Sequence, residues 1–124
     1  GYQWGSGPLK RSMLRRYYRF LWEVSLRTLE CGEQVIPCVA GRAHLVIWAT
    51  GDVASCELLP TVGNLYKEPL SEILAGERLR QQVDGIRHKH CACTHNCAML
   101  DSILLNPLNY PKMLASRGVV SGTD

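Results

Sequence analysis

The sequence predicts a small α+β domain with an N-terminal helix, a β-hairpin, and then helices around a cysteine-rich loop. Apolar residues recur at helical spacing from about Pro8 to Leu29. A strand-like run at residues 43–49 meets a returning strand at 53–56 through the turn Thr50-Gly51-Asp52. Three of the six cysteines fall within residues 91–97. At 124 residues, the chain has room for one domain.

Local signals set the bounds of the first elements. Residues 1–7 hold three glycines and no periodicity, and we expect them to form a flexible lead-in. Pro8 lacks the N–H that a first helical turn leaves unbonded, and Gly32 is the expected end of this helix. The hairpin, the later helices and the cysteine-rich loop follow this helix, and we expect the last residues to form a loose tail. The expected division is residues 1–34 for the lead-in and linking helix, 35–114 for the domain, and 115–124 for the tail.

The second half of the chain predicts turns and short helices. Residues 60–64 are expected to form a turn because they contain a proline and the pair Gly63-Asn64. A helical pattern opens at Pro69 and continues to residue 86. Residues 88–95 form a polar loop, and a short helix at 98–105 ends before a proline. A two-stranded hairpin is marginal alone, so we expect the cysteines to hold it in place.

Composition excludes several classes of protein. The chain is 46% hydrophobic and 20% charged, which is ordinary for a globular domain. It has no apolar run near the roughly 18–20 residues that span a bilayer. It also has no secretory signal pattern. We therefore expect a soluble, cytoplasmic domain with no membrane span.

The net charge of +3 is concentrated in the first helix. Residues 1–27 carry six Lys or Arg against one Glu, whereas the remaining residues carry eight against ten. Together with Tyr17, Tyr18, Phe20 and Trp22, these charges are compatible with RNA or an anionic membrane surface. No basic patch extends them elsewhere in the sequence. We therefore expect a solvated face or a face that packs on a partner domain, and no nucleic-acid partner.

Five of the six cysteines form two groups, a pattern typical of a metal site. Cys38 and Cys56 bracket the hairpin, and Cys91, Cys93 and Cys97 lie within seven residues. A disulfide framework is disfavoured by the lack of a signal peptide and by a cysteine content below that of disulfide scaffolds. A zinc site needs four thiolates, or three with His90 or His95, but the paired Cys-X-X-Cys knuckles of zinc ribbons are absent. The favoured interpretation is an iron–sulfur cluster held by four thiolates.

The order of these motifs resembles the C-terminal auxiliary-cluster region of radical S-adenosylmethionine enzymes, known as the SPASM domain or, in its shorter form, the twitch domain. Cys38, Gly51 and Cys56 match the first half of its motif, with twelve and four residues between them. The second half has three cysteines, fewer than a full SPASM domain with two clusters. The resemblance also includes the segments Cys38-Val-Ala-Gly-Arg, Ala49-Thr-Gly-Asp-Val-Ala-Ser-Cys56, Val62-Gly-Asn-Leu65, Leu70-Ser-Glu-Ile73 and Cys91-Ala-Cys-Thr-His-Asn-Cys97. It implies a twitch-like domain with one auxiliary [4Fe–4S] cluster.

The resemblance also implies roles for individual residues. Cys38 and Cys56 are expected ligands, and two of the three loop thiols at Cys91, Cys93 and Cys97 complete the site. Cys31 lies outside the matched motif, and we expect it to be a small core residue. Arg42 and His95 lie beside the candidate ligands, and we expect both to be solvated rather than to tune the cluster.

The catalytic barrel of that family carries a Cys-X₃-Cys-X₂-Cys motif, which this sequence lacks. We therefore expect an auxiliary role in electron transfer or substrate positioning and no catalysis by this chain alone. The expected partner is the catalytic barrel of a parent radical S-adenosylmethionine enzyme, on which the aromatic face of the first helix would pack. S-adenosylmethionine would bind only to that barrel, and the substrate would be a peptide or a small molecule. The alternative function is a zinc-stabilised interaction module whose basic aromatic helix binds a protein or nucleic acid.

Overall fold

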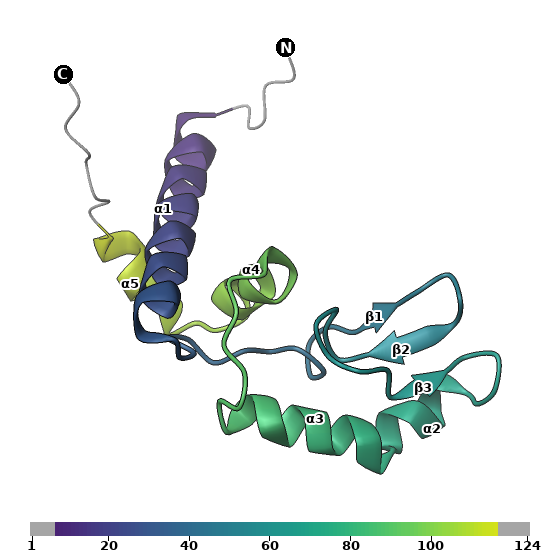
Figure 1. Cartoon of the computed structure of the whole chain (residues 1–124). Helices are drawn as coiled ribbons and strands as arrows, with labels where there is room; N and C mark the ends of the chain where they lie inside the picture. The colour runs from purple at the N-terminus through teal and green to yellow at the C-terminus, as the bar shows by residue number, and fades with distance from the viewer. Residues whose placement is uncertain (1–6, 117–124) are drawn as a thin grey trace.

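A computed structural model describes residues 7–116 of the chain (Figure 1). The predicted lead-in and tail fall largely on residues 1–6 and 117–124, which lie outside the described residues. The helices are α1 (Pro8–Cys31), α2 (Leu70–Ala75), α3 (Glu77–Arg87), α4 (Asn96–Leu104) and α5 (Asn109–Ala115). The strands are β1 (Val46–Ile47), β2 (Asp52–Ala54) and β3 (Gly63–Asn64). The small α+β fold predicted from the sequence is therefore confirmed.

Helix α1 begins and ends close to its predicted bounds. Pro8 occupies the first turn, where its missing N–H leaves no hydrogen bond unmade. Gly32 follows the helix in the left-handed conformation, with φ of 68°, and its N–H donates to the carbonyl of Thr28. The residues buried along α1 recur at helical spacing and form one stripe: Tyr17, Phe20, Leu21, Val24 and Thr28.

The sheet has three strands rather than the two predicted. β1 pairs with β2 and β2 pairs with β3, both antiparallel, in the order β1-β2-β3. The predicted turn at Gly63-Asn64 forms the third strand, because the side chain of Asn64 donates to the Thr50 carbonyl and to the Asp52 carboxylate. Gly51 makes the first turn with φ of 81°, a conformation that glycine adopts without a steric penalty.

Helix α5 was not predicted by the sequence pattern. Its residue Met113 packs into a core formed mainly by α1 and α4. The Asn109 side chain is buried and donates hydrogen bonds to the carbonyls of Ser102 and Ile103 at the end of α4. These contacts stabilise a seven-residue helix that would be too short to form alone.

The aromatic residues of α1 are divided between the core of the chain and its surface. Tyr17 and Phe20 are buried against Met99, Ile103 and Met113. By contrast, Tyr18 and Trp22 keep 56% and 67% of their surface exposed. Packing of this helix on another domain therefore stays a prediction, and Tyr18 and Trp22 are the aromatic residues left exposed for it.

Three small hydrophobic cores follow one another through the molecule. The first joins α1 to α4 and α5, and the third holds the sheet against α2 and α3 around Val53 and Ile73. The middle core contains Ile86 of α3 and Ala98 of α4, and cysteines make up much of it. In Figure 1 the helices α1, α4 and α5 lie on one side of the molecule and the sheet with α2 and α3 on the other. The cysteines therefore sit where the two halves meet.

Among the helices of residues 7–116, none has both the length and the apolar character needed to cross a membrane.

Candidate metal centre

Five thiols converge on the middle core from separate parts of the chain. Cys38 lies between α1 and β1, Cys56 lies two residues after the end of β2, and Cys91 and Cys93 lie in the loop between α3 and α4. Cys97 lies in the first turn of α4. Cys56 is buried in the middle core, and Cys38, Cys91 and Cys97 pack against it. Cys93 lines a small cavity together with Cys38 and Cys91. None of the six cysteines of the chain forms a disulfide.

The thiols are close enough to influence one another electrostatically. Burial raises the pKa of the Cys56 thiol, and negative charge on Cys93 and Cys38 raises it further. Burial also raises the pKa of Cys91, with further contributions from Cys38, Cys93 and Cys56. The pKa of Cys97 is raised first by burial and then by charge on Cys56, Glu57 and Cys93. Each negative sulfur therefore makes the neighbouring thiols harder to deprotonate, and a bound cation offsets that repulsion.

Polar hydrogens also point at the sulfurs. The Leu58 N–H donates to the Cys56 Sγ at 3.5 Å and lowers its pKa, against the effect of burial. The backbone N–H of Ala98 acts in the same direction on Cys97. Hydrogen bonds to sulfur ligands stabilise negative charge and set the reduction potential of iron–sulfur clusters.

Gln34, which no sequence motif marks, joins two of the cysteine segments. Its side-chain NH₂ donates to the carbonyl of Cys91 at 2.9 Å, to the carbonyl of Ile86 at 3.1 Å, and to the Cys91 Sγ at 3.6 Å. Its carbonyl oxygen accepts a hydrogen bond from the Cys38 N–H at 3.4 Å. A single glutamine after a helix carries no motif, so no sequence signal distinguishes it.

Ser102 of α4 makes a second such link that the sequence analysis missed. Its hydroxyl accepts a hydrogen bond from the Val39 N–H at 3.1 Å and donates one to the Ala98 carbonyl at 2.6 Å. The segment next to Cys38 is therefore fixed to the helix that carries Cys97. Ser102 is only 2% exposed, so water does not compete for these bonds.

His95 and Glu57 lie beside Cys97. The Nδ1 atom of His95 is 2.9 Å from the Cys97 Sγ, and its Nε2 atom is 3.4 Å from a carboxylate oxygen of Glu57. One ligand atom from each of the three residues lies within 4.8 Å of the other two. This mixed sulfur, nitrogen and oxygen set is one that zinc also accepts.

Two residues predicted to be merely solvated, Arg42 and His95, contact cysteine segments. The Arg42 guanidinium donates to the Cys38 carbonyl at 2.9 Å, while the rest of its side chain is exposed. His95 keeps 41% of its side chain exposed despite its contact with Cys97. Cys31 is exposed at the last residue of α1, so the expectation that it is a core residue is wrong.

The donor set suits an iron–sulfur cluster. A [4Fe–4S] cluster takes four cysteine thiolates, and five thiols that form no disulfide are gathered here. They come from four places in the fold, and the core, Gln34 and Ser102 hold these places together. The residues present therefore fit the group that the sequence motif implies.

A comparison with family models supports the same chemistry. Residues 38–98, just under half of the chain, match SPASM, an iron–sulfur cluster-binding domain. The matched segment begins at Cys38 and contains the other four thiols of the middle core. It thus supports iron–sulfur cluster binding by this part of the chain. No curated protein and no solved structure matches the chain.

Proposed function

We propose that residues 38–98 hold one [4Fe–4S] cluster and that the chain is an auxiliary domain of a radical S-adenosylmethionine enzyme. The observation that carries the proposal is the convergence of Cys38, Cys56, Cys91, Cys93 and Cys97 with no disulfide among them. Cys38 and Cys56 would be two of the ligands, and two of the three loop thiols would be the others. The fifth thiol would then be in contact with the site without being needed to hold it.

When bound, such a cluster supplies one-electron redox chemistry. The chain's own contribution is to shield and orient the site. Cys56 is 6% exposed and Ala98 is 2% exposed, so the apolar lining keeps water from one side. Cys93 and His95 border an open groove on the other side, lined also by Leu58 and Ala92. A partner barrel that carries the substrate would approach from that open side and exchange electrons there.

The experiment is anaerobic reconstitution of the full chain followed by iron, sulfide and zinc analysis. We expect about four irons and four sulfides per chain, as one [4Fe–4S] cluster requires. Cys38→Ser and Cys56→Ser should each lose most of the iron, because a serine hydroxyl is a poor ligand for this cluster. Serine substitution of each loop thiol in turn identifies the remaining pair.

Cys31→Ser is the matched control, because Cys31 is exposed and bonds only weakly to the Glu33 carbonyl, at 3.7 Å. It should retain iron and sulfide at the level of the unaltered chain. Full iron retention in Cys56→Ser would contradict the ligand assignment. One zinc per chain without sulfide would contradict the cluster itself.

The zinc result would favour the second candidate function, a zinc-stabilised interaction module. One observation favours this zinc-stabilised module: Glu57, His95 and Cys97 offer oxygen, nitrogen and sulfur ligands within 4.8 Å of one another. In that case His95→Ala would lower zinc affinity. With a [4Fe–4S] cluster on four thiols, the same substitution should leave the iron content unchanged.

A further inference from the structure

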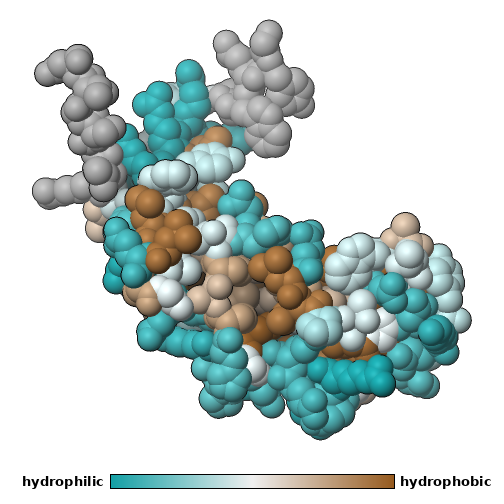
Figure 2. Space-filling view, in the orientation of Figure 1, coloured by the Kyte–Doolittle hydropathy of each residue, from teal (hydrophilic) through white to brown (hydrophobic). Residues whose placement is uncertain are grey.

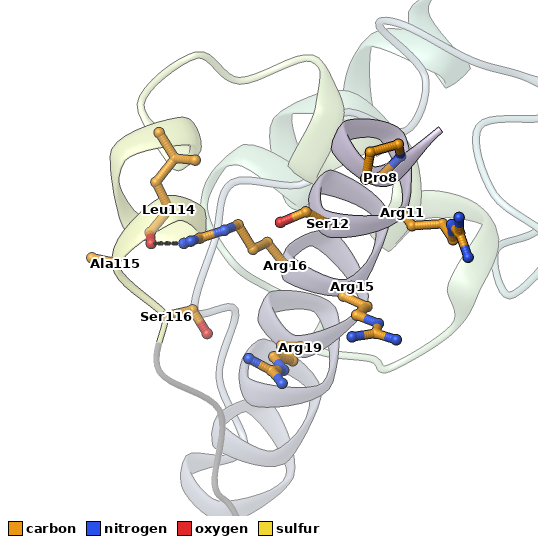
Figure 3. A pocket seen from close by; sticks show the side chains of 9 residues that line it. All are labelled: Pro8, Arg11, Ser12, Arg15, Arg16, Arg19, Leu114, Ala115 and Ser116. Atoms are coloured by element: carbon orange, nitrogen blue, oxygen red, sulfur yellow. Dashed lines mark hydrogen bonds between the residues drawn. The ribbon is translucent and has the colours of Figure 1, made fainter. Parts of the chain in front are cut away.

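Four arginines line a groove at the N-terminal half of α1, away from the thiols. The groove has a volume of about 960 Å³ and is lined by Pro8, Arg11, Ser12, Arg15, Arg16 and Arg19 of α1 and by Leu114, Ala115 and Ser116. Arg16 donates a hydrogen bond to the Leu114 carbonyl and so ties α1 to α5. Figure 3 shows Arg16 directed at α5, whereas Arg11 and Arg15 extend away from it.

Arg11, Arg15 and Arg19 are exposed and lie four residues apart, which places them in one row along the helix. Among residues 7–116, no salt bridge joins any of the four arginines to a carboxylate. Glu23 lies one turn after Arg19, but its carboxylate accepts a hydrogen bond from the Ser116 hydroxyl instead. Arg11, Arg15 and Arg19 therefore form no ion pair in the described part of the chain.

This arrangement is unfavourable for the isolated helix. Like charges four residues apart repel each other. The first turn of α1 contains no acidic residue, so the positive end of the helix dipole faces further positive charge. A helix that needed only to be solvated would gain stability from acidic residues at these positions. An anionic partner removes both costs.

The residues beside the row indicate what kind of partner this is. Tyr18 and Trp22 each follow an arginine of the row by three residues and are 56% and 67% exposed. In Figure 2, hydrophilic residues cover the upper end of α1. Arginine, tyrosine and tryptophan are the residue types that dominate the binding energy of protein interfaces.

We propose that this face of α1, defined by Arg11, Arg15, Arg19, Tyr18 and Trp22, docks an acidic protein surface that carries apolar side chains between its carboxylates. Guanidinium groups bind carboxylates in a bidentate manner, and the two exposed rings supply apolar contact area. A protein is favoured over RNA because the net positive charge is confined to residues 1–27: residues 28–124 carry eight Lys or Arg against ten Asp or Glu. The proposal does not depend on whether the thiols bind a cluster.

The test uses the full chain and a short fluorescein-labelled peptide rich in glutamate and leucine, with binding followed by fluorescence anisotropy. The variant is the triple substitution Arg11→Ala, Arg15→Ala and Arg19→Ala, which leaves Arg16 and its bond to α5 intact. We expect the dissociation constant to rise by about tenfold or more. Trp22→Ala should also weaken binding, whereas Trp48→Ala, on the far side of the molecule near β1, should not.

The matched control removes three exposed arginines of α3, with Arg78→Ala, Arg80→Ala and Arg87→Ala. It changes the net charge by the same amount and should change the affinity less than about twofold, since only general attraction is lost. Equal losses in both triple variants, or no binding by the unaltered chain, would overturn the proposal. Tighter binding of an oligouridine with the same charge as the peptide would overturn the choice of a protein partner. Circular dichroism and iron content, measured on each variant, should match the unaltered chain.

Discussion

At the scale of single residues, Gln34 is a side chain that joins two cysteine-bearing segments directly. It bonds to the backbone of Cys38 and of Cys91, which are 53 residues apart in the sequence, and to the carbonyl of Ile86 in α3. Without it, the Cys91 carbonyl and the Cys38 N–H would lose their protein partner, whereas the Ile86 carbonyl would keep the Lys89 N–H. Such groups cost free energy when they are shielded from water.

We therefore predict that Gln34→Leu lowers the free energy of unfolding of the metal-free chain by about 1–3 kcal/mol. It should also speed the loss of iron from the loaded chain, because the Cys38 and Cys91 segments are no longer joined. Anaerobic urea unfolding and the rate of iron transfer to a chelator measure the two effects. Gln81→Leu is the control, since Gln81 bonds only to the exposed Glu77 carboxylate. A Gln34 variant that matches this control would show that the amide does not hold the site.

The contrast between Gln34 and the cysteines explains what the sequence can predict at this scale. Cys38, Gly51 and Cys56 stand at a recognisable spacing, and three further thiols lie within seven residues, so the candidate ligands were visible. The bonds of Gln34 and Ser102 depend on where distant segments meet. A glutamine or serine in isolation has no spacing that predicts such a contact. The side chains that hold the cysteine segments together could therefore be identified only from the structure.

At the scale of elements, Gly41 determines how closely the Cys38 segment approaches the sheet and α3. Its φ is 75°, and a Cβ atom there would lie 2.7 Å from the Val83 Cγ2 and 2.8 Å from the Ser55 Cβ. Ser55 is fully buried, and Gln82 of α3 accepts a hydrogen bond from its hydroxyl at 2.6 Å. Ser55 therefore cannot move aside without losing this hydrogen bond.

We predict that Gly41→Ala lowers the free energy of unfolding by about 2–4 kcal/mol, from the left-handed backbone and from overpacking together. It should also reduce iron binding, because Cys38 lies only three residues away. Gly85→Ala in α3 is the matched control: its added Cβ would meet only the His90 Nδ1, at 3.7 Å. That control should be neutral or gain up to about 1 kcal/mol from helix propensity. Equal stability of the two variants in urea unfolding would contradict the argument.

The elements that the sequence failed to predict share a physical cause. β3 is two residues long and depends on the Asn64 side chain and on the Val62 N–H, which donates to the Val53 carbonyl at 2.7 Å. α5 depends on the burial of Asn109 and Met113 against α1 and α4. In both cases tertiary contacts stabilise a segment whose local pattern is weak. α1, which carries a long periodic stripe, was predicted to within two residues at its C-terminal end.

At the scale of the whole molecule, the cysteines make up much of the contact between its two halves. The middle core has few apolar side chains besides Ile86, Leu59 and two alanines, and the rest of its lining is cysteine. Burial raises the pKa of Cys56, Cys91 and Cys97, so these thiols hold their protons at neutral pH when no cation is bound. A protonated thiol makes only weak hydrogen bonds, so we expect this junction to be the least stable of the three cores in the metal-free chain.

A cluster that binds the folded chain and not the unfolded one stabilises the fold by mass action. We predict that removing it with a chelator lowers the apparent free energy of unfolding by about 3 kcal/mol or more, which corresponds to a fall in Tm of at least about 10 °C. Hydrogen exchange should rise first in the residues 38–41, 56–59 and 91–98 that surround the thiols. It should rise less in α1, whose amides from Tyr17 to Thr28 are protected by the core shared with α4 and α5. If removal of the cluster left hydrogen exchange around the thiols unchanged, the two halves of the molecule would pack together without the cluster, contrary to this prediction.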